Sequence, residues 1–494
     1  MQVHAQVDSL VDAVLDRLGR RIVLGLPLGL GKANHIANAL YDRAAQDPSI
    51  HLRILTALSL DPPQPSGNLE QRFLSPINAR LFGGYPRLRY VQALRAGMLP
   101  ANVEVSEFFL TAGQWLGVAP MQQQFICANY THATRYLLDQ GVNLVAQLVA
   151  RKPSGELSLS CNPELTLELL GPMRERSRAG IPCMLVGQVN DALPFMLGDP
   201  VLAPERMDHL LDDDSTRFPL FTPPRRPVDP SAHAIGLRIA ALVPDGGTLQ
   251  IGIGGIADAV CHGLILRHTH NDAFRLLHEQ LSPGPSAAPP RPQGDDAHPI
   301  TDAQRRTGDA PELGAFEQGL YGLSEMFVDG FLHLYRHGVL KRSAGDGALL
   351  HAGFFLASNG LHETLREMPD HERARFQMKP ISFVNELYDS DTASEQTKRH
   401  DRQGARFINS AMMVTALGGV VSDTLEDAQV VSGVGGQYNF VAQAFALRDA
   451  RSIIALNATR QHEGRCVSNI RWAHSSETIP RHLRDIVVTE YGVA

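Results

Sequence analysis

A short apolar run followed by a glycine turn and a helical pattern opens both halves of this chain, and this arrangement restricts the fold more than any other feature. The pattern occupies residues 20–46 and returns at 247–266. Further β-rich runs, each next to a helical or turn pattern, cover 51–60, 142–153, 182–190, 427–447 and 451–459. Parallel strands need a crossover connection, so strands that alternate with helices predict parallel sheets. We therefore expect an α/β protein with two similar open-sheet domains.

Two segments divide the chain. The segment 214–232 is rich in prolines, which remove backbone donors from helices and sheets. We interpret it as a linker between domains at 1–213 and 233–494, with a long loop inside one domain as the alternative. The segment 281–313 has little apolar surface to bury and is predicted to be a mobile insertion in the second domain. The histidines in and beside it show no recurring ligand spacing, so a metal site is not expected.

The charge and cysteine content exclude several classes of protein. The formal net charge of −7 is spread without long runs of one sign, which argues against a nucleic-acid-binding or membrane-binding surface. The five cysteines include no C-x-x-C pair, which indicates reduced thiols rather than disulfides or a zinc site. The N-terminal stretch lacks the apolar core of a signal peptide, and no uncharged apolar run is long enough to span a membrane. We expect a cytoplasmic protein.

The stretch 247–260, GTLQIGIGGIADAV, raises the question of a nucleotide site. Gly252, Gly254 and Ala257 fit the G-x-G-x-x-G/A fingerprint of dinucleotide-binding domains. Such a domain also needs an acidic residue at the end of the next strand, about 20 positions on. The corresponding position falls near Asn271 and Asp272, in a stretch that is not a strand. An NAD-dependent oxidoreductase is thus an alternative that rests on the glycines alone.

Three more glycine-rich turns are predicted to join a strand to a helix, at 25–31, 418–419 and 433–436. Glycine lets the backbone approach a ligand closely, and the helix behind such a turn favours anions. Several such turns in one chain favour a long phosphate-bearing ligand or an oxyanion site formed by backbone amides. Each turn taken alone is equally consistent with a tight turn that binds nothing.

Glu325 lies in GLSEMFVDG, residues 322–330, directly before the apolar Met326 and Phe327. A carboxylate among such neighbours fits a desolvated nucleophile or base. On this evidence alone, a helix-capping or surface glutamate is the more frequent case. Neither a G-x-S-x-G elbow nor a P-loop occurs in the chain, which leaves serine hydrolases and P-loop enzymes unsupported.

Six motifs, taken in chain order, resemble the acetyl-CoA hydrolase/transferase family of class I CoA-transferases. They are ANYTH (128–132), VGQVNDALPFMLGDP (186–200), GTLQIGIGGIADAV (247–260), GLSEMFVDG (322–330), VVSGVGGQYNFV (430–441) and RDIVVTEYGVA (484–494). Each motif is weak alone, whereas the ordered combination is specific. The resemblance implies two α/β domains with the active site between them.

The resemblance also implies a reaction, the transfer of CoA from acetyl-CoA or another short-chain acyl-CoA to a small carboxylate. Glu325 matches the family's glutamate, which attacks the thioester to give an acyl-glutamyl anhydride and CoA thiolate. The thiolate then forms a glutamyl-CoA thioester, and a second carboxylate reverses the steps. Coenzyme A is a substrate in this scheme, so neither a tightly bound cofactor nor a metal is expected. Relatives commonly associate, which implies a homo-oligomer, with a dimer as the expectation.

Further site residues follow from the resemblance. Asn385 resembles an asparagine that contacts the catalytic glutamate, and Gly435 and Gly436 would donate backbone N–H groups to the oxyanion. Gln188 and Asn190, in the first domain, would face the acyl group. The glycines expected to bind CoA are Gly252, Gly254, Gly255 and Gly433.

The chain departs from the family pattern in several places. Leu323 replaces a histidine two residues before the glutamate, and Asn439 stands where an aspartate is frequent. Relatives also continue beyond TEYGVA, so we expect a fragment of a longer polypeptide. Two alternatives stay open. One is an acyl-CoA hydrolase of the same family, in which water captures the covalent intermediate. The other is an inactive CoA-binding protein, which Leu323 and the 281–313 insertion favour.

Overall fold

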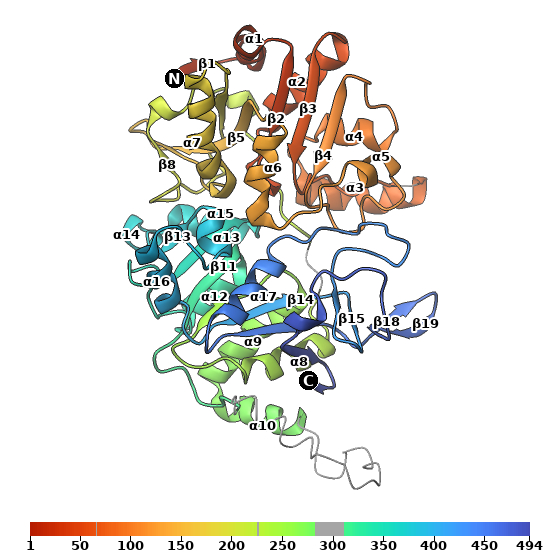
Figure 1. Ribbon diagram of the computed structural model, residues 1–494, viewed down its shortest axis with the longest axis vertical. Coiled ribbons are helices and arrows are strands. Elements are labelled where there is room, and N and C mark those ends of the chain that lie inside the picture. Colours follow the sequence, from red (N-terminus) through yellow and green to blue (C-terminus); the bar gives the residue numbers. More distant parts are fainter. Residues whose placement is uncertain (66, 225–226, 282–310) are drawn as a thin grey trace.

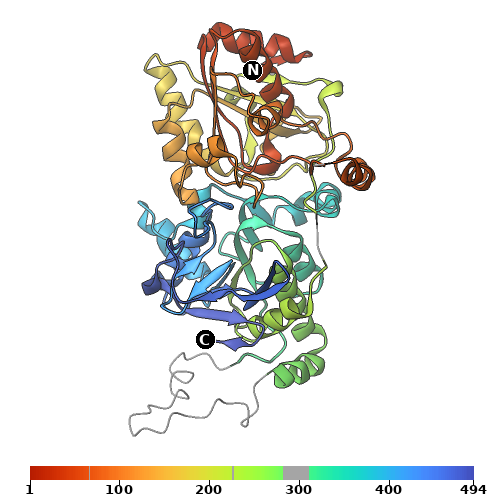
Figure 2. The same ribbon diagram turned by 90° about the vertical axis from the view of Figure 1, so that its right-hand side faces the viewer.

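The two halves of the chain form two stacked units along the long axis of the molecule (Figures 1 and 2). The structure is a computed structural model, and it describes residues 1–65, 67–224, 227–281 and 311–494. Each half is built on one large sheet whose strands are mostly parallel, with helices packed on it. The predicted α/β fold with two open sheets is confirmed.

The first sheet has nine strands, seven of which lie in the order β1-β9-β7-β5-β2-β3-β4. Its strands are β1 (Gln2–His4), β2 (Arg21–Gly25), β3 (His51–Thr56), β4 (Val103–Glu107), β5 (Leu144–Arg151), β6 (Leu157–Ser158), β7 (Met184–Val189), β8 (Val201–Leu202) and β9 (His209–Leu211). The helices of this half are α1 (Val7–Leu18), α2 (Asn34–Gln46), α3 (Asn68–Phe82), α4 (Arg89–Arg95), α5 (Ala119–Gln124), α6 (Ala133–Asp139) and α7 (Glu164–Arg178).

The second sheet has eight strands in the order β13-β12-β11-β10-β14-β17-β21-β22. They are β10 (Thr248–Gln250), β11 (Tyr321–Phe327), β12 (Leu350–Phe355), β13 (Phe376–Met378), β14 (Arg406–Ser410), β17 (Arg451–Ala455), β21 (Ile486–Thr489) and β22 (Gly492–Val493). Smaller sheets contain β15 (Met413–Thr415), β16 (Val420–Val421), β18 (Thr459–His462), β19 (Arg465–Ser468) and β20 (Ile470–Arg471). The helices are α8 (Pro230–Ala240), α9 (Gly255–Thr269), α10 (Asn271–Leu281), α12 (Asp329–Arg336), α13 (Asn359–Glu367), α14 (Asp370–Arg373), α15 (Ile381–Asn385), α16 (Thr392–Asp401) and α17 (Gln437–Ala446).

In both sheets a central strand is followed along the chain by strands on one side of it and then by strands on the other. β2 has β3 and β4 on one side and β5 and β7 on the other, and β10 lies in the same way between β11 and β14. Ligands of open α/β sheets bind outside the carboxyl ends of the strands at such a switch point. The glycine turns at 25–31 and 252–255 follow the two central strands. The fold therefore predicts a ligand site near the carboxyl ends of β2, β10 and β11.

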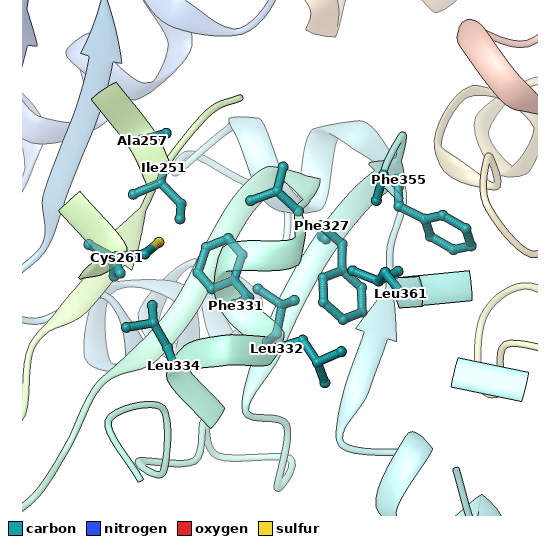
Figure 3. Close-up of a cluster of buried hydrophobic side chains, with 14 of the residues drawn as sticks. Ile251, Ala257, Cys261, Phe327, Phe331, Leu332, Leu334, Phe355 and Leu361 are labelled. Atoms are coloured by element: carbon teal, nitrogen blue, oxygen red, sulfur yellow. The ribbon is translucent and has the colours of Figure 1, made fainter. Parts of the chain in front are cut away.

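A continuous apolar core supports the end of β10 and the start of α12. Ile251, Cys261 and Phe331 come from the end of β10, from α9 and from α12, and they lie close together (Figure 3). All three are at most 4% exposed. Complete burial of a side chain such as phenylalanine contributes roughly 1.5–3 kcal/mol, so this cluster fixes α9 and α12 on the sheet.

Three local predictions are wrong. No strand forms at 427–435, where the described backbone pairs with the first half of the chain instead. Gly418 and Gly419 do not lead into a helix, because they form the turn between β15 and β16, which pair antiparallel. The proline-rich segment does contain helix, since Asp229 accepts a hydrogen bond from Ala232 N and Pro230 begins α8. Proline is tolerated there because the first N–H groups of a helix have no helical partner.

The domain limits at 213 and 233 stay a prediction. The first sheet ends at Leu211 and the second begins at Thr248, and Phe218 and Phe221 of the predicted linker belong to a buried apolar cluster with members from both halves. The predicted insertion at 281–313 lies almost wholly outside the described residues.

Candidate active site

Glu325 lies near the carboxyl end of β11, on the face of the sheet that α15 and α17 cover. Side chains alternate along a strand, so Tyr321, Leu323 and Glu325 point to the same side. Tyr321 and Leu323 pack there in an apolar cluster with Val384 of α15 and Phe440 of α17. Leu323 is fully buried, which accounts for an apolar residue at that position. Glu325 therefore lies within a strand, and it is neither a helix cap nor a surface residue.

Asn385 and the glycine pair 435–436 surround the Glu325 carboxylate. Asn385 Nδ2 donates a hydrogen bond to Glu325 Oε2 over 2.6 Å. A Cβ atom added to Gly436 would overlap with both Glu325 Oε2 and Asn385 Nδ2. Gly435 has a φ of +57°, which glycine adopts without strain. The structure thus brings together Glu325, Asn385, Gly435 and Gly436, although they lie far apart in the sequence.

The glycine loop is held by the first half of the chain. Tyr130 N donates to Gly435 O over 2.9 Å, and Asn439 Nδ2 donates to Thr131 Oγ1 over 3.0 Å. A Cβ on Gly433 would lie 2.8 Å from Phe109 Cδ2. Gly433 is therefore required by close packing between the halves, and its predicted contact with CoA stays a prediction. The loop at 433–436, where the sequence predicted a strand, therefore holds the two halves of the chain together.

Burial raises the pKa of Glu325 to about 7, and the hydrogen bond from Asn385 limits this rise. Glu325 is half-buried as a residue. A carboxyl group with a pKa near the operating pH is ionised in a large fraction of molecules and yet little stabilised by water. This is the state expected of a carboxylate nucleophile.

Replacing Glu325 by glutamine is expected to stabilise the fold at alkaline pH. The folded protein binds this proton more tightly than the unfolded chain, so stability falls as pH rises from the ordinary pKa of 4.5 through about 7. The full shift corresponds to roughly 3 kcal/mol, and we expect about 2 kcal/mol because the side chain is partly exposed. Urea unfolding at pH 5 and pH 8 measures this, and an identical pH response of Glu325→Gln and the wild type would contradict it.

The glycines of the turn after β10 lie at the same sheet edge as Glu325, because β10 pairs with β11 in parallel. A Cβ on Gly252, Gly254 or Gly255 would meet nothing within 4 Å. Gly254 has a φ of +108° and precedes the first residue of α9. The turn therefore presents open backbone in front of a helix N-terminus, which favours anions.

Gln188 and Asn190 use their polar atoms within the first half of the chain. Gln188 Nε2 donates to Thr216 O over 2.9 Å, and Asn190 Nδ2 donates to Phe218 O over 3.0 Å. Both side chains are at most 1% exposed. A substrate would have to displace these bonds, so we do not include the two residues in the site proposed below.

A second buried carboxyl group lies near Glu325 and was not identified from the sequence. Glu164, the first residue of α7, accepts hydrogen bonds from Tyr130 Oη and from Asn162 Nδ2. The one sequence signal that points toward Glu164 is its partner Tyr130, which belongs to the ANYTH motif. No spacing rule connects Tyr130 to a glutamate 34 residues later.

The described residues contain no group of three or more His, Cys, Asp or Glu side chains arranged to hold a metal ion. Within the same residues, no helix is long and apolar enough to cross a membrane.

Comparisons with known proteins agree with the fold and the motifs. Residues 359–494 match the model of the acetyl-CoA hydrolase/transferase C-terminal domain. The chain is 25% identical over 316 residues to the 4-hydroxybutyrate coenzyme A transferase of Clostridium kluyveri, which covers 63% of this chain and 57% of that protein. It is 26% identical over 317 residues to the succinyl-CoA:cyclohexane-1-carboxylate CoA transferase of Geobacter metallireducens, covering 63% and 56%. The alignments thus span little more than half the length of these relatives.

Solved structures share the fold over the whole chain. RipA from Yersinia pestis superposes with a TM-score of 0.68 at 20% identity, covering 99% of this chain and 92% of that one. The 4-hydroxybutyrate CoA-transferase from Porphyromonas gingivalis gives a TM-score of 0.60 at 18% identity, covering 100% and 89%. Residues 359–494 thus match the acetyl-CoA hydrolase/transferase C-terminal domain, and the curated CoA-transferase relatives and the ordered motifs of the chain agree with that match.

Proposed function

We propose that this protein is an acyl-CoA:carboxylate CoA-transferase in which Glu325 carries CoA. The observation that supports this most is the Glu325 carboxylate itself, which has a pKa near neutrality and is hydrogen-bonded by Asn385 beside the glycine pair 435–436. The relatives are named for different carboxylates, so the proposed substrate class is an acyl-CoA and a small carboxylate. The match of residues 359–494 to the acetyl-CoA hydrolase/transferase C-terminal domain supports the same reaction class.

Glu325 acts first as a nucleophile in this proposal. Its carboxylate attacks the thioester carbonyl of acyl-CoA, and the C–S bond breaks to give an acyl-glutamyl anhydride and CoA thiolate. The thiolate attacks the glutamyl carbonyl and releases the acyl group as a carboxylate. Binding the distant parts of CoA holds the thiolate near the anhydride, which favours this step over loss to water.

The two glycine turns would serve different parts of the substrate. Each tetrahedral intermediate carries an oxyanion, and the backbone N–H groups of Gly435 and Gly436, in the loop that packs on Glu325, would donate to it. The open turn at Gly252, Gly254 and Gly255 would accept CoA next to the N-terminus of α9. Oxyanion stabilisation and CoA binding would both use backbone amides. Glycine is therefore needed only at positions where a side chain would block the approach of the substrate to these amides.

Replacing Asn385 by alanine is expected to reduce kcat/KM at pH 7 by roughly 10- to 100-fold. A hydrogen bond to a charged group contributes about 1.5–3 kcal/mol, and Asn385 is the side-chain donor to Glu325. Without it the pKa of Glu325 rises, so the acidic limb of the rate profile should move to higher pH. A rate profile of Asn385→Ala with the acidic limb of the wild type would contradict this role.

An exchange experiment tests the proposed function. The protein is incubated with acetyl-CoA and labelled acetate, and both the label in acetyl-CoA and the total thioester are followed. Transfer predicts that label enters acetyl-CoA while the total thioester stays constant. Steady loss of thioester would instead identify the hydrolase of the same family, and no change in either quantity would indicate an inactive CoA-binding protein.

We also propose that the enzyme is a cytoplasmic homodimer with domains at 1–213 and 233–494. All five cysteines are free thiols, which fits a reducing compartment. Sedimentation at several concentrations would test the oligomeric state.

A further inference from the structure

We propose that Glu164 is a positioning residue of this active site. In this proposal Glu164 stays protonated and uncharged, so that Glu325 carries the single negative charge of the two carboxyl groups. The inference rests on the proposed function, because it explains how Glu325 is kept ionised for attack. It assigns a role to a residue that neither the motifs nor the proposed reaction includes.

The surroundings of Glu164 fit an acid that keeps its proton. The side chain is 1% exposed. Its Oε1 accepts hydrogen bonds from Tyr130 Oη over 2.7 Å and from Asn162 Nδ2 over 3.0 Å. Its Oε2 has no hydrogen-bond partner among the described residues. A buried carboxylate with one unpartnered oxygen is costly, whereas a protonated carboxyl group requires less solvation.

Glu164 is linked to the Glu325 site on two sides. A Cβ added to Gly353 of β12 would lie 3.2 Å from Glu325 O and 3.6 Å from Glu164 Cβ, so a single glycine lies between the two residues. Tyr130 provides the second link, because its hydroxyl binds Glu164 while its backbone N–H binds Gly435 O. The same tyrosine therefore connects Glu164 to the loop that packs on Glu325.

The titratable groups that face Glu164 come from several elements. They are Lys32, Cys161, Tyr130 and Glu325, with Glu168 near Tyr130. Lys32 is fully buried, but its Nζ donates to Pro27 O over 2.8 Å and to Ala57 O over 2.6 Å, so its protons go to carbonyl oxygens. Burial lowers the pKa of Lys32 to about 7, which weakens it further as a counter-ion.

The order in which the two carboxyl groups lose their protons follows from burial. Burial, with a smaller contribution from the Glu325 charge, raises the pKa of Glu164 to about 8, whereas that of Glu325 rises to about 7. Glu164 is also the more deeply buried of the two and has one oxygen without a hydrogen-bond partner among the described residues, so Glu325 ionises first and the pair holds one negative charge near neutral pH. A second charge above that pH would repel the anionic carboxylate and thiolate that the proposed reaction brings to the site.

The pH profile of kcat/KM for CoA transfer tests the proposal, since it reports the ionisation of the free enzyme. For the wild type we expect a fall of about fivefold between pH 7 and pH 9. Ionisation of Glu164, with a pKa of about 8, lowers the rate about tenfold, and the completed ionisation of Glu325, with a pKa of about 7, offsets about twofold of this. In Glu164→Gln the position is permanently neutral, so this fall should disappear. Glu175→Gln, an exposed change on the same helix, should keep it.

Tyr130→Phe is a second variant, in which the alkaline limb is expected to shift rather than to disappear. The hydroxyl of Tyr130 stabilises the ionised form of Glu164, so its removal should raise the pKa of Glu164 and move the alkaline limb to higher pH. The proposal is wrong if Glu164→Gln, or Tyr130→Phe where the first variant does not fold, keeps the alkaline limb of the wild type. Lys32 would then be the group responsible.

Infrared spectroscopy separates this proposal from the proposed function. A protonated buried carboxyl group absorbs above the carboxylate bands, and the wild type minus Glu164→Gln difference at pH 7 should contain that absorption whether or not CoA is transferred. Transfer activity without the protonated band overturns the role of Glu164 alone. The band without any transfer overturns the proposed function and leaves the protonation of Glu164 established.

Discussion

Glu325→Gln should abolish CoA transfer, with kcat/KM falling by at least about 1,000-fold, since loss of a covalent nucleophile removes the whole reaction path. The amide has nearly the shape of the carboxylate and retains an oxygen for the hydrogen bond from Asn385. The variant should therefore fold, bind CoA and form no anhydride. Initial rates of label exchange between acetate and acetyl-CoA measure the effect.

Glu363→Gln is the matched control for this experiment. Glu363 is an exposed glutamate on α13 in the same half of the chain, so its charge is solvated and its replacement should leave the exchange rate within a factor of about two. If Glu325→Gln retained a rate similar to that of this control, Glu325 would not be the nucleophile, and the covalent scheme would have to be abandoned.

Gly436→Ala should lower kcat/KM by about 100-fold or more, although it adds only one methyl group. The new Cβ would overlap with Glu325 Oε2 and Asn385 Nδ2, so the carboxylate, the amide or the loop has to move. The loop has little freedom to do so, because the neighbouring Gly435 is bonded through its carbonyl to Tyr130 N. A displacement of about 1 Å at a reacting group can cost about 100-fold in rate.

Gly171→Ala provides the control for the added methyl group. A Cβ on Gly171, within α7, would meet nothing within 4 Å. Alanine there should leave the exchange rate unchanged, and the following Pro172 offsets the higher helix propensity of alanine. Equal activity of Gly436→Ala and Gly171→Ala would show that the glycine pair does not position Glu325.

The sequence predicted the parallel sheets because its apolar runs are short, β-rich and separated by helical patterns. β2, β3, β5, β7, β10 and β17 all lie within predicted runs. The stretch 427–435 looked the same, but it forms no strand, and its backbone partners include Leu110, Gly113 and Tyr130 in the other half of the chain. Local pattern describes the residues of one segment and contains no information on which distant backbone will pair with it.

The site was predictable only in part for the same reason. Glu325, Asn385, Gly435 and Gly436 were grouped by resemblance to a family, and the structure brings them into contact. Glu164 carries no motif, and its relation to Glu325 depends on the packing of α7 against β12. The short fingerprint at Gly252 and Gly254 described an open turn before a helix, and it was uninformative about the identity of the ligand.

The most direct test of the central claim is the mass of the residue-325 peptide after incubation with acetyl-CoA and reduction with borohydride. Borohydride converts a glutamyl-CoA thioester to the corresponding alcohol and leaves a free carboxylate unchanged. The proposed mechanism predicts that Glu325 is recovered as the alcohol, and that acetate added in excess before reduction restores the unmodified residue. Recovery of unmodified Glu325 from a protein that is actively exchanging label would contradict it.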